Sequence, residues 1–154
     1  SGFKQFTRLA KKSKKLVRFT IMSAFRICTE QKTFQCSVET LKNITTDLKN
    51  VTEILKHHSI KVISAEQNFA ELEWQGMGKI KVNRQLNCEF PEVEYIFSGL
   101  MGYTLILRII IKVSHNLLCI ESETQIPVVF RAMVKPQLLQ FQNQFRDALC
   151  GLTS

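Results

Sequence analysis

Between residues 60 and 124 the apolar residues recur mostly at every second position, and this long alternating stretch is what most constrains the fold. Alternation of this kind is typical of β-strands that bury one face. Glycine, proline and a His-Asn pair divide the stretch into short segments, at Gly76, Gly78, Pro91, Gly99, Gly102 and His115-Asn116. The pattern therefore predicts six strands joined by short turns, an antiparallel meander.

The sequence on either side of this stretch has other periods. Residues 33–40 alternate and predict one more strand, whereas residues 44–57 have apolar residues at helical spacing and predict one or two short helices. Residues 129–152 repeat apolar residues every three or four positions, which predicts a long C-terminal helix. Pro136 then lies near the start of this helix or bends it, and Gly151 ends it.

Together these elements predict an α+β fold. We expect a seven-stranded antiparallel sheet wrapped around the long C-terminal helix, with short helices after the first strand. Only residues 129–152 form a helix long enough to cover the apolar face of such a sheet. A strongly twisted sheet around one helix leaves space between them, so we expect a ligand cavity there.

Charge divides the chain into two parts. Residues 1–27 contain eight of the 21 lysines and arginines and no acidic residue, so the other 13 bases balance the 13 acids. We therefore predict a basic leader over residues 1–30 and a neutral domain over residues 31–154. The neutral domain lacks the basic excess that phosphate contacts require, and no specific nucleic-acid binding is expected of it. The amphipathic leader is either a solvated arm or a contact for an anionic membrane or nucleic acid.

Several classes of protein have no support in the sequence. No stretch is apolar for long enough to span a bilayer, and residues 1–27 lack the apolar core of a secretory signal, so a cytoplasmic location is expected. The five cysteines form no Cys-x-x-Cys motif, and free thiols are expected. His57 and His58 diverge by about 100° on a helix, so no metal site is expected. The absence of a nucleotide-binding fingerprint predicts no cofactor.

The order of the predicted elements resembles that of the START-like superfamily, the helix-grip proteins that include lipid-transfer START domains, birch-pollen-allergen-like proteins and polyketide cyclase-like proteins. The body is most similar to small archaeal members of unassigned function. This resemblance implies that a hydrophobic or amphipathic, lipid-like molecule binds between helix and sheet. It covers residues 33–152 and lies in a strand at 34–40, helices at 44–57, a strand at 60–64 that leads into the meander, and Pro127 before the last helix.

Residues in phase with inward apolar positions are the candidate ligand contacts. Arg84 shares the phase of Val82, and an inward guanidinium binds a carboxylate or phosphate in a bidentate pair. The alternative is a strand end that turns Arg84 outward. Tyr95 and Ser122 either hold the polar end of a ligand or form hydrogen bonds within the sheet. The predicted apolar wall of the cavity consists of Trp74, Phe97, Leu107, Phe130, Met133 and Phe141. The alternative is that these side chains only pack the core.

These observations predict a non-catalytic binding or carrier protein for a hydrophobic small molecule. One alternative is a cyclase- or aromatase-like enzyme that uses polar groups of the cavity as acid and base, although no residue is assigned a catalytic role. The other is an interaction module whose basic leader docks on a membrane or on nucleic acid.

Overall fold

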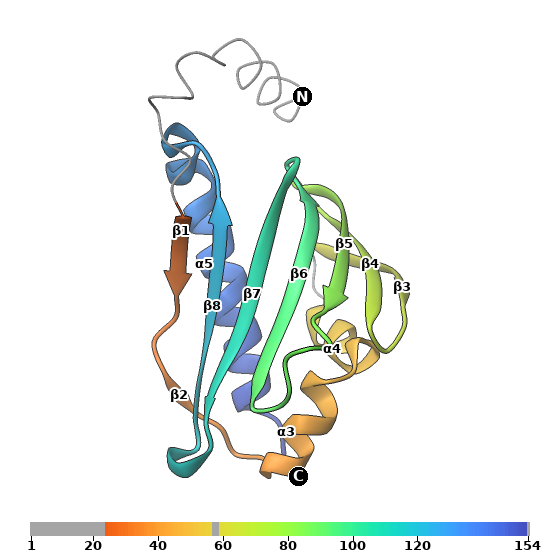
Figure 1. Ribbon diagram of the computed structural model, residues 1–154, viewed down its shortest axis with the longest axis vertical. Helices are drawn as coiled ribbons and strands as arrows, with labels where there is room; N and C mark the ends of the chain where they lie inside the picture. Colours follow the sequence, from red (N-terminus) through yellow and green to blue (C-terminus); the bar gives the residue numbers. More distant parts are fainter. Residues whose placement is uncertain (1–23, 57–58, 154) are drawn as a thin grey trace.

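A computed structural model describes residues 24–56 and 59–153. This part of the chain forms an antiparallel sheet of eight strands together with three α-helices, which confirms the predicted α+β class (Figure 1). The elements follow one another as β1 (Ala24–Cys28), β2 (Lys32–Thr33), α3 (Val38–Thr45), α4 (Leu48–Leu55), β3 (Ile60–Ala65), β4 (Phe69–Trp74), β5 (Gly78–Arg84), β6 (Glu92–Leu100), β7 (Tyr103–Lys112), the 3₁₀ turn η1 (Val113–His115), β8 (Leu117–Gln125) and α5 (Val128–Cys150).

The strands lie in the order β1-β8-β7-β6-β5-β4-β3, and β2 also pairs with β8. Each strand from β3 to β8 is therefore a neighbour of the next one in the sequence, and the predicted six-stranded meander is confirmed. The register places Tyr95 opposite Leu107, and Leu107 opposite Ser122. These three side chains consequently lie in one row across the face of the sheet that is buried.

The predicted strand over residues 33–40 is wrong. Helix α3 already begins at Val38, because the Ser37 side chain accepts a hydrogen bond of 3.1 Å from the backbone N–H three residues further on. Phe34 and Cys36 are buried, but they belong to an irregular segment between β2 and α3. Alternating burial over such a short stretch arises without any strand pairing.

The edge of the sheet is formed instead by β1, at residues 24–28, which pairs with β8. The sheet therefore begins inside residues 1–30, the range predicted for the basic leader. The preceding residues, 1–23, lie outside the part of the chain that the structure describes.

The helical segment predicted at residues 44–57 is confirmed over α4, whereas α3 lies almost entirely before it and replaces the end of the predicted strand. The break between α3 and α4 lies at Thr46 and Asp47. Asp47 starts α4 because its carboxylate accepts a 3.0 Å hydrogen bond from the Lys49 backbone N–H. Aspartate is one of the residues favoured at this capping position, so the start of α4 has a local cause in the sequence.

Helix α5 runs along one face of the sheet behind β8, as Figure 1 shows. It begins at Val128 and passes through Pro136, so the alternative in which the helix starts near the proline is wrong. Its end at Gly151 is confirmed. The core lies between α5, α4 and the inner face of the sheet. Among the helices described, none combines the length and apolar character needed to cross a membrane.

Candidate functional site

Four aromatic side chains fill the interior between α5 and the half of the sheet that lies farthest from β1. Trp74 of β4 lies 4.8 Å from Phe141 of α5, measured between ring centroids, and Phe97 of β6 lies 6.2 Å from the same ring. Phe145 stacks on Phe141 at 6.1 Å. All four side chains are buried. We call these residues the aromatic cluster, and three of them belong to the predicted apolar wall.

Tyr95 lies beside this cluster, on the inner face of β6, and is buried as predicted. Its hydroxyl donates a 2.5 Å hydrogen bond to the backbone carbonyl of Thr45, at the end of α3. Burial raises the pKa of Tyr95 well above its ordinary value, and the nearby Arg84 opposes this shift only in part. The phenol is therefore a neutral donor that joins the sheet to α3.

Ser122 of β8 is likewise buried, and it contacts a residue that the sequence analysis missed. The serine hydroxyl donates a 2.6 Å hydrogen bond to Gln142 Oε1. Gln142 Nε2 in turn donates to the carbonyls of Ile27, at 2.9 Å, and Ile120, at 3.1 Å. The sequence does contain one indication of this contact. Gln142 directly follows Phe141, and so adjoins the apolar stripe of the helix.

Arg84 lies at the end of β5, half-buried, opposite Tyr95 in the strand register. Its Nε donates a 3.0 Å hydrogen bond to Asn68 Oδ1, in the turn between β3 and β4. The guanidinium is thus held at the rim of the sheet, as in the strand-end alternative. Leu86, the next residue in the phase of Val82 and Arg84, is 64% exposed because β5 stops at Arg84.

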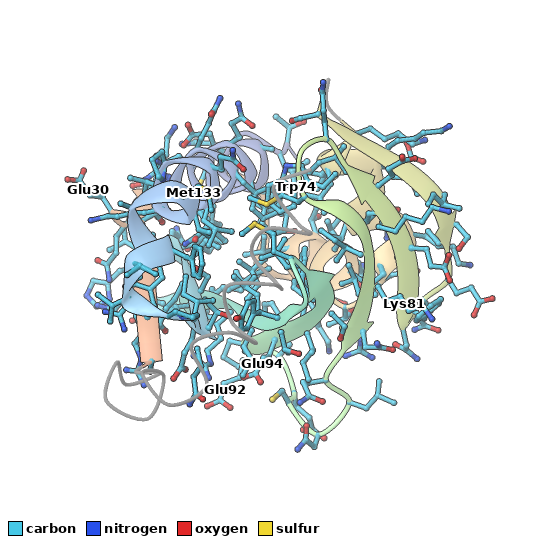
Figure 2. The ribbon with its side chains drawn as sticks, turned by 90° about the horizontal axis from the view of Figure 1, so that it is seen from above. Glu30, Trp74, Lys81, Glu92, Glu94 and Met133 are labelled. Atoms are coloured by element: carbon cyan, nitrogen blue, oxygen red, sulfur yellow. The ribbon has the colours of Figure 1, made fainter. Side chains whose placement is uncertain are left out.

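The remaining predicted wall residues differ in their burial. Leu107 is buried in the centre of the sheet and Phe130 is half-buried. Met133 is 54% exposed, and so does not belong to the closed interior. In the view from above, Met133 on α5 and Trp74 on β4 lie apart from each other (Figure 2). Val128 and Val129 are exposed as well, and the first two turns of α5 thus present apolar side chains to solvent.

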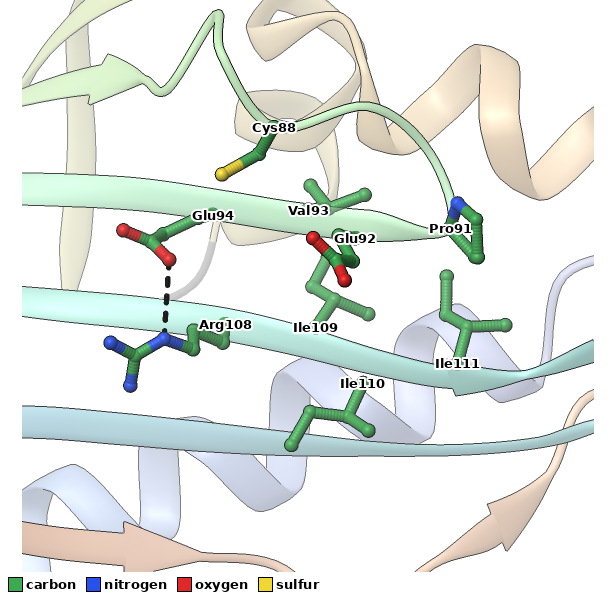
Figure 3. A pocket seen from close by; sticks show the side chains of 9 residues that line it. All are labelled: Cys88, Pro91, Glu92, Val93, Glu94, Arg108, Ile109, Ile110 and Ile111. Atoms are coloured by element: carbon green, nitrogen blue, oxygen red, sulfur yellow. Dashed lines mark hydrogen bonds and ion pairs between the residues drawn. The ribbon is translucent and has the colours of Figure 1, made fainter.

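A groove of about 510 Å³ lies on the other face of the sheet, across β6 and β7 (Figure 3). Arg108 donates from Nε to Glu94, at 3.1 Å, and from Nη1 to Glu123, at 2.8 Å. The Arg108 guanidinium holds the pKa of the Glu123 carboxyl below its usual range. This charged face was not predicted as a site. The groove is lined by Cys88, Pro91, Glu92, Val93, Glu94, Arg108, Ile109, Ile110 and Ile111.

The described part of the chain contains no group of three or more His, Cys, Asp or Glu side chains close enough together to bind a metal ion. All five cysteines are free thiols. Besides Tyr95, the buried polar side chains in the same part of the chain are four threonines, Ser122 and Gln142. The interior therefore offers neutral hydrogen-bonding groups among apolar walls.

Comparison with known proteins gives structural likenesses alone. No family model and no curated protein matches the chain. A structural-genomics structure of a protein from Nitrosospira multiformis has a TM-score of 0.49 at 8% identity, over 82% of this chain and 97% of the other. A solution NMR structure of a Staphylococcus epidermidis protein, also a structural-genomics target, has a TM-score of 0.48 at 12% identity, over 80% and 88%.

Proposed function

We propose that the protein binds a hydrophobic or amphipathic small molecule, such as a lipid, between α5 and the inner face of the sheet. One observation carries the proposal: α5 packs closely on β8 and β1, but meets β4 and β6 through the aromatic cluster. Side chains rather than backbone fill this part of the interior. Rings that rotate aside leave apolar walls for an acyl chain or a fused ring system, and burial of apolar surface then drives binding.

The apolar start of α5 supports a route into this interior. Val129 is 71% exposed and Met133 54%, while the aromatic cluster lies further along the same helix. Exposed apolar side chains at the start of the helix whose later turns carry the buried cluster offer a ligand a first apolar contact as it leaves water. Methionine adapts readily to ligands of irregular shape. We therefore assign the first two turns of α5 as the entrance to the site.

Arg84 is the residue proposed to hold the polar end of an acidic ligand. Its Nε is engaged by Asn68, and the guanidinium has further N–H donors that bind a carboxylate or phosphate. The position of Arg84 at the rim leaves such a headgroup in contact with water, which avoids the cost of burying a charge. Tyr95 and Ser122 are already paired with Thr45 and Gln142, so they shape the wall.

The element order supports the resemblance to START-like proteins, and membership of that superfamily is part of this proposal. Two strands at one edge are followed by two short helices, a six-stranded meander and a long last helix. Nothing in the described interior favours acid–base chemistry, so the cyclase-like alternative is not proposed. The carrier interpretation needs apolar walls and one polar contact; the aromatic cluster supplies the walls once its rings rotate aside, and Arg84 supplies the contact.

Trp74 is the only tryptophan in the sequence and lies within the aromatic cluster, so its fluorescence reports directly on the proposed site. We expect dibromostearate to quench this fluorescence saturably, because bromine quenches tryptophan on contact, and methyl dibromostearate to bind more weakly if Arg84 holds the carboxylate. Arg84→Gln should abolish this difference between acid and ester. Replacement of Ile106, which faces the other side of the sheet, by Ala is the matched control and should change neither titration.

The proposal is wrong if quenching rises linearly with the concentration of the brominated acid without saturation. It is also contradicted if native mass spectrometry detects no complex with stearate under conditions that preserve the fold. A saturable signal that is identical in the Phe141→Leu variant and the original protein would place the acid elsewhere, since Phe141 contacts Trp74 directly.

A further inference from the structure

Two thiols lie next to each other where the edge strand β1 ends. Cys28 is the last residue of β1, and Cys119 lies on the neighbouring strand β8. Their Sγ atoms are 3.8 Å apart, although 91 positions separate the two residues in the sequence. Cys28 is exposed to solvent and Cys119 is buried. The Cys28 sulfur is therefore accessible to a reagent in solution, and the buried Cys119 sulfur lies next to it.

The backbone explains why these side chains meet. Cys28 is paired with Glu121, and the Thr29 backbone N–H still donates a 3.0 Å hydrogen bond to the Ile120 carbonyl, but pairing resumes only at Lys32, which is opposite Leu118. Two residues of the edge, Glu30 and Gln31, therefore bulge out where β8 presents Cys119. Cys28 and Cys119 are diagonal neighbours on the same face, a relation that brings side chains of adjacent strands within reach. A disulfide bond is about 2.05 Å long, so each sulfur has to move by only about 1 Å.

We propose that Cys28 and Cys119 form a modification site, a dithiol that low-molecular-weight disulfides such as oxidised glutathione convert to an intramolecular disulfide. The inference is independent of the proposed ligand site, which lies on the other face of the sheet. Thiol pairs that are oxidised transiently are the usual disulfides of reducing compartments.

The reaction is two successive thiol–disulfide exchanges. The Cys28 thiolate attacks one sulfur of oxidised glutathione, forms a mixed disulfide and releases the first glutathione thiolate. Cys119 then loses its proton to solvent and attacks the Cys28 sulfur, which releases the second glutathione thiolate. The protein dithiol is oxidised by two electrons, and the glutathione disulfide is reduced to two thiols once both thiolates take up protons.

The order of the two steps follows from the difference in burial. Burial raises the pKa of the Cys119 thiol to about 11, and the adjacent Cys28 adds to the shift. Cys119 is therefore protonated at neutral pH and shielded from large reagents. Solvent-exposed Cys28 is the entry point for the oxidant, and Cys119 resolves the mixed disulfide.

The bond would fasten a junction of three elements. The Ile27 carbonyl, next to Cys28, accepts a hydrogen bond from Gln142 of α5. In the bulge, the Glu30 carbonyl accepts a 3.0 Å hydrogen bond from Arg146, and Lys32 lies 3.0 Å from Asp147. Oxidation therefore ties β1 covalently to β8 at the place where both contact α5, and it closes a long loop of the unfolded chain.

The test treats the full chain, reduced and then freed of reductant, with oxidised glutathione and follows intact mass and disulfide-linked peptides. We expect the product to be lighter by two hydrogen atoms and to yield a peptide pair joined through Cys28 and Cys119. Cys119→Ala should stop at a glutathione adduct on Cys28, because the resolving thiol is missing, whereas Cys28→Ser should give neither product. Cys88→Ser, which removes a thiol outside this pair, is the matched control and should behave like the original protein.

A wild-type protein that stops at the glutathione adduct on Cys28 would overturn the proposal, as would a disulfide through any other cysteine pair. The oxidised protein should also melt at a temperature higher by about 5–10 °C, as expected for a long closed loop in a chain of this size. An unchanged or lower melting temperature would overturn the inference that the bond fits the native junction.

Discussion

The two faces of strands β6, β7 and β8 differ in how their polar side chains are paired and exposed. On the inner face, Tyr95 and Ser122 are almost fully buried, and each donates one hydrogen bond to a neutral acceptor. On the outer face, Glu94, Arg108 and Glu123 keep 20–30% of their side-chain surface in water and share charges among several partners. The same strands thus carry two chemistries, separated by a single sheet.

This difference in exposure determines how each face responds to the loss of a polar partner. A polar group inside the domain has no water to replace a lost partner, so its hydrogen bond must be made within the protein. The outer charges exchange partners with solvent, and individual exposed ion pairs contribute little to stability. Substitutions on the inner face should therefore change the free energy of unfolding much more than neighbouring substitutions on the outer face.

The largest expected effect is that of Phe97→Ala on the inner face. Phe97 is buried and contacts Phe141 of α5, so truncation leaves a cavity between sheet and helix. We expect the free energy of unfolding to fall by about 3–5 kcal/mol. Urea denaturation followed by circular dichroism measures this loss.

Ile96, the neighbouring residue on the same strand, is only half-buried on the outer face and gives the matched control. Ile96→Ala should cost clearly less than Phe97→Ala. Equal losses from the two substitutions would contradict the assignment of inner and outer faces.

A smaller effect is expected for Tyr95→Phe, which keeps the ring and removes only the hydroxyl. The carbonyl of Thr45 loses its donor, and we expect a loss of about 1–2 kcal/mol at neutral pH. Because burial raises the folded-state pKa of Tyr95 above its ordinary value of 10.0, the hydroxyl stabilises the fold fully below pH 10 and progressively less above it. Denaturation at several pH values should show the difference between the two proteins narrowing above pH 10. A constant difference would indicate that Tyr95 is not buried in the folded protein.

The inner face was largely predictable from the sequence because burial of one side of a strand imposes a period of two. This holds for β4 to β8, for the start of β3, and for the inward positions of Tyr95 and Ser122. The end of β5 was not predictable, because Arg84 is held by Asn68 in a turn that the alternating pattern does not reveal.

The partners of the buried polar groups could not be predicted either. The acceptor of Tyr95 is the end of α3, whose position depends on packing of the whole domain. Gln142 was assigned no role from the sequence, yet it joins α5 to β1 and β8. Such contacts join residues far apart in the chain, and periodicity describes only neighbours. The outer network around Arg108 has the same origin, since its carboxylates come from the two flanking strands.

The charged outer face predicts a still smaller effect for Arg108→Gln, one that depends on pH. Arg108 lowers the pKa of Glu123 from its ordinary value of 4.5, so the ionised carboxylate stabilises the fold above that pH and loses this contribution as pH falls through its lower, folded-state pKa. The variant should be less stable than the original at neutral pH, by less than Tyr95→Phe, and should lose stability less steeply in acid.

Urea denaturation of both proteins at a series of pH values, from neutral to acidic, measures the free energy of unfolding and tests this prediction. Asp147 provides an internal control, because Lys32 and Arg146 lower its pKa independently of Arg108 and its acid-dependent contribution should remain. Identical acid profiles for the variant and the original protein would show that Arg108 and Glu123 do not interact in solution.

The smallest effect is expected for Ile110→Ser, in the groove on the outer face. Ile110 is 36% exposed, and a polar replacement there should change the free energy of unfolding by less than about 0.5 kcal/mol. Ile109→Ser, at the adjacent inner position, should cost several times more, since it removes a buried side chain and introduces a hydroxyl into the core. Urea denaturation of the two variants, repeated over a range of protein concentrations, separates the faces. A large loss for Ile110→Ser that depends on concentration would mean that another copy covers the outer face, and the contrast between the faces would then hold only for the isolated chain.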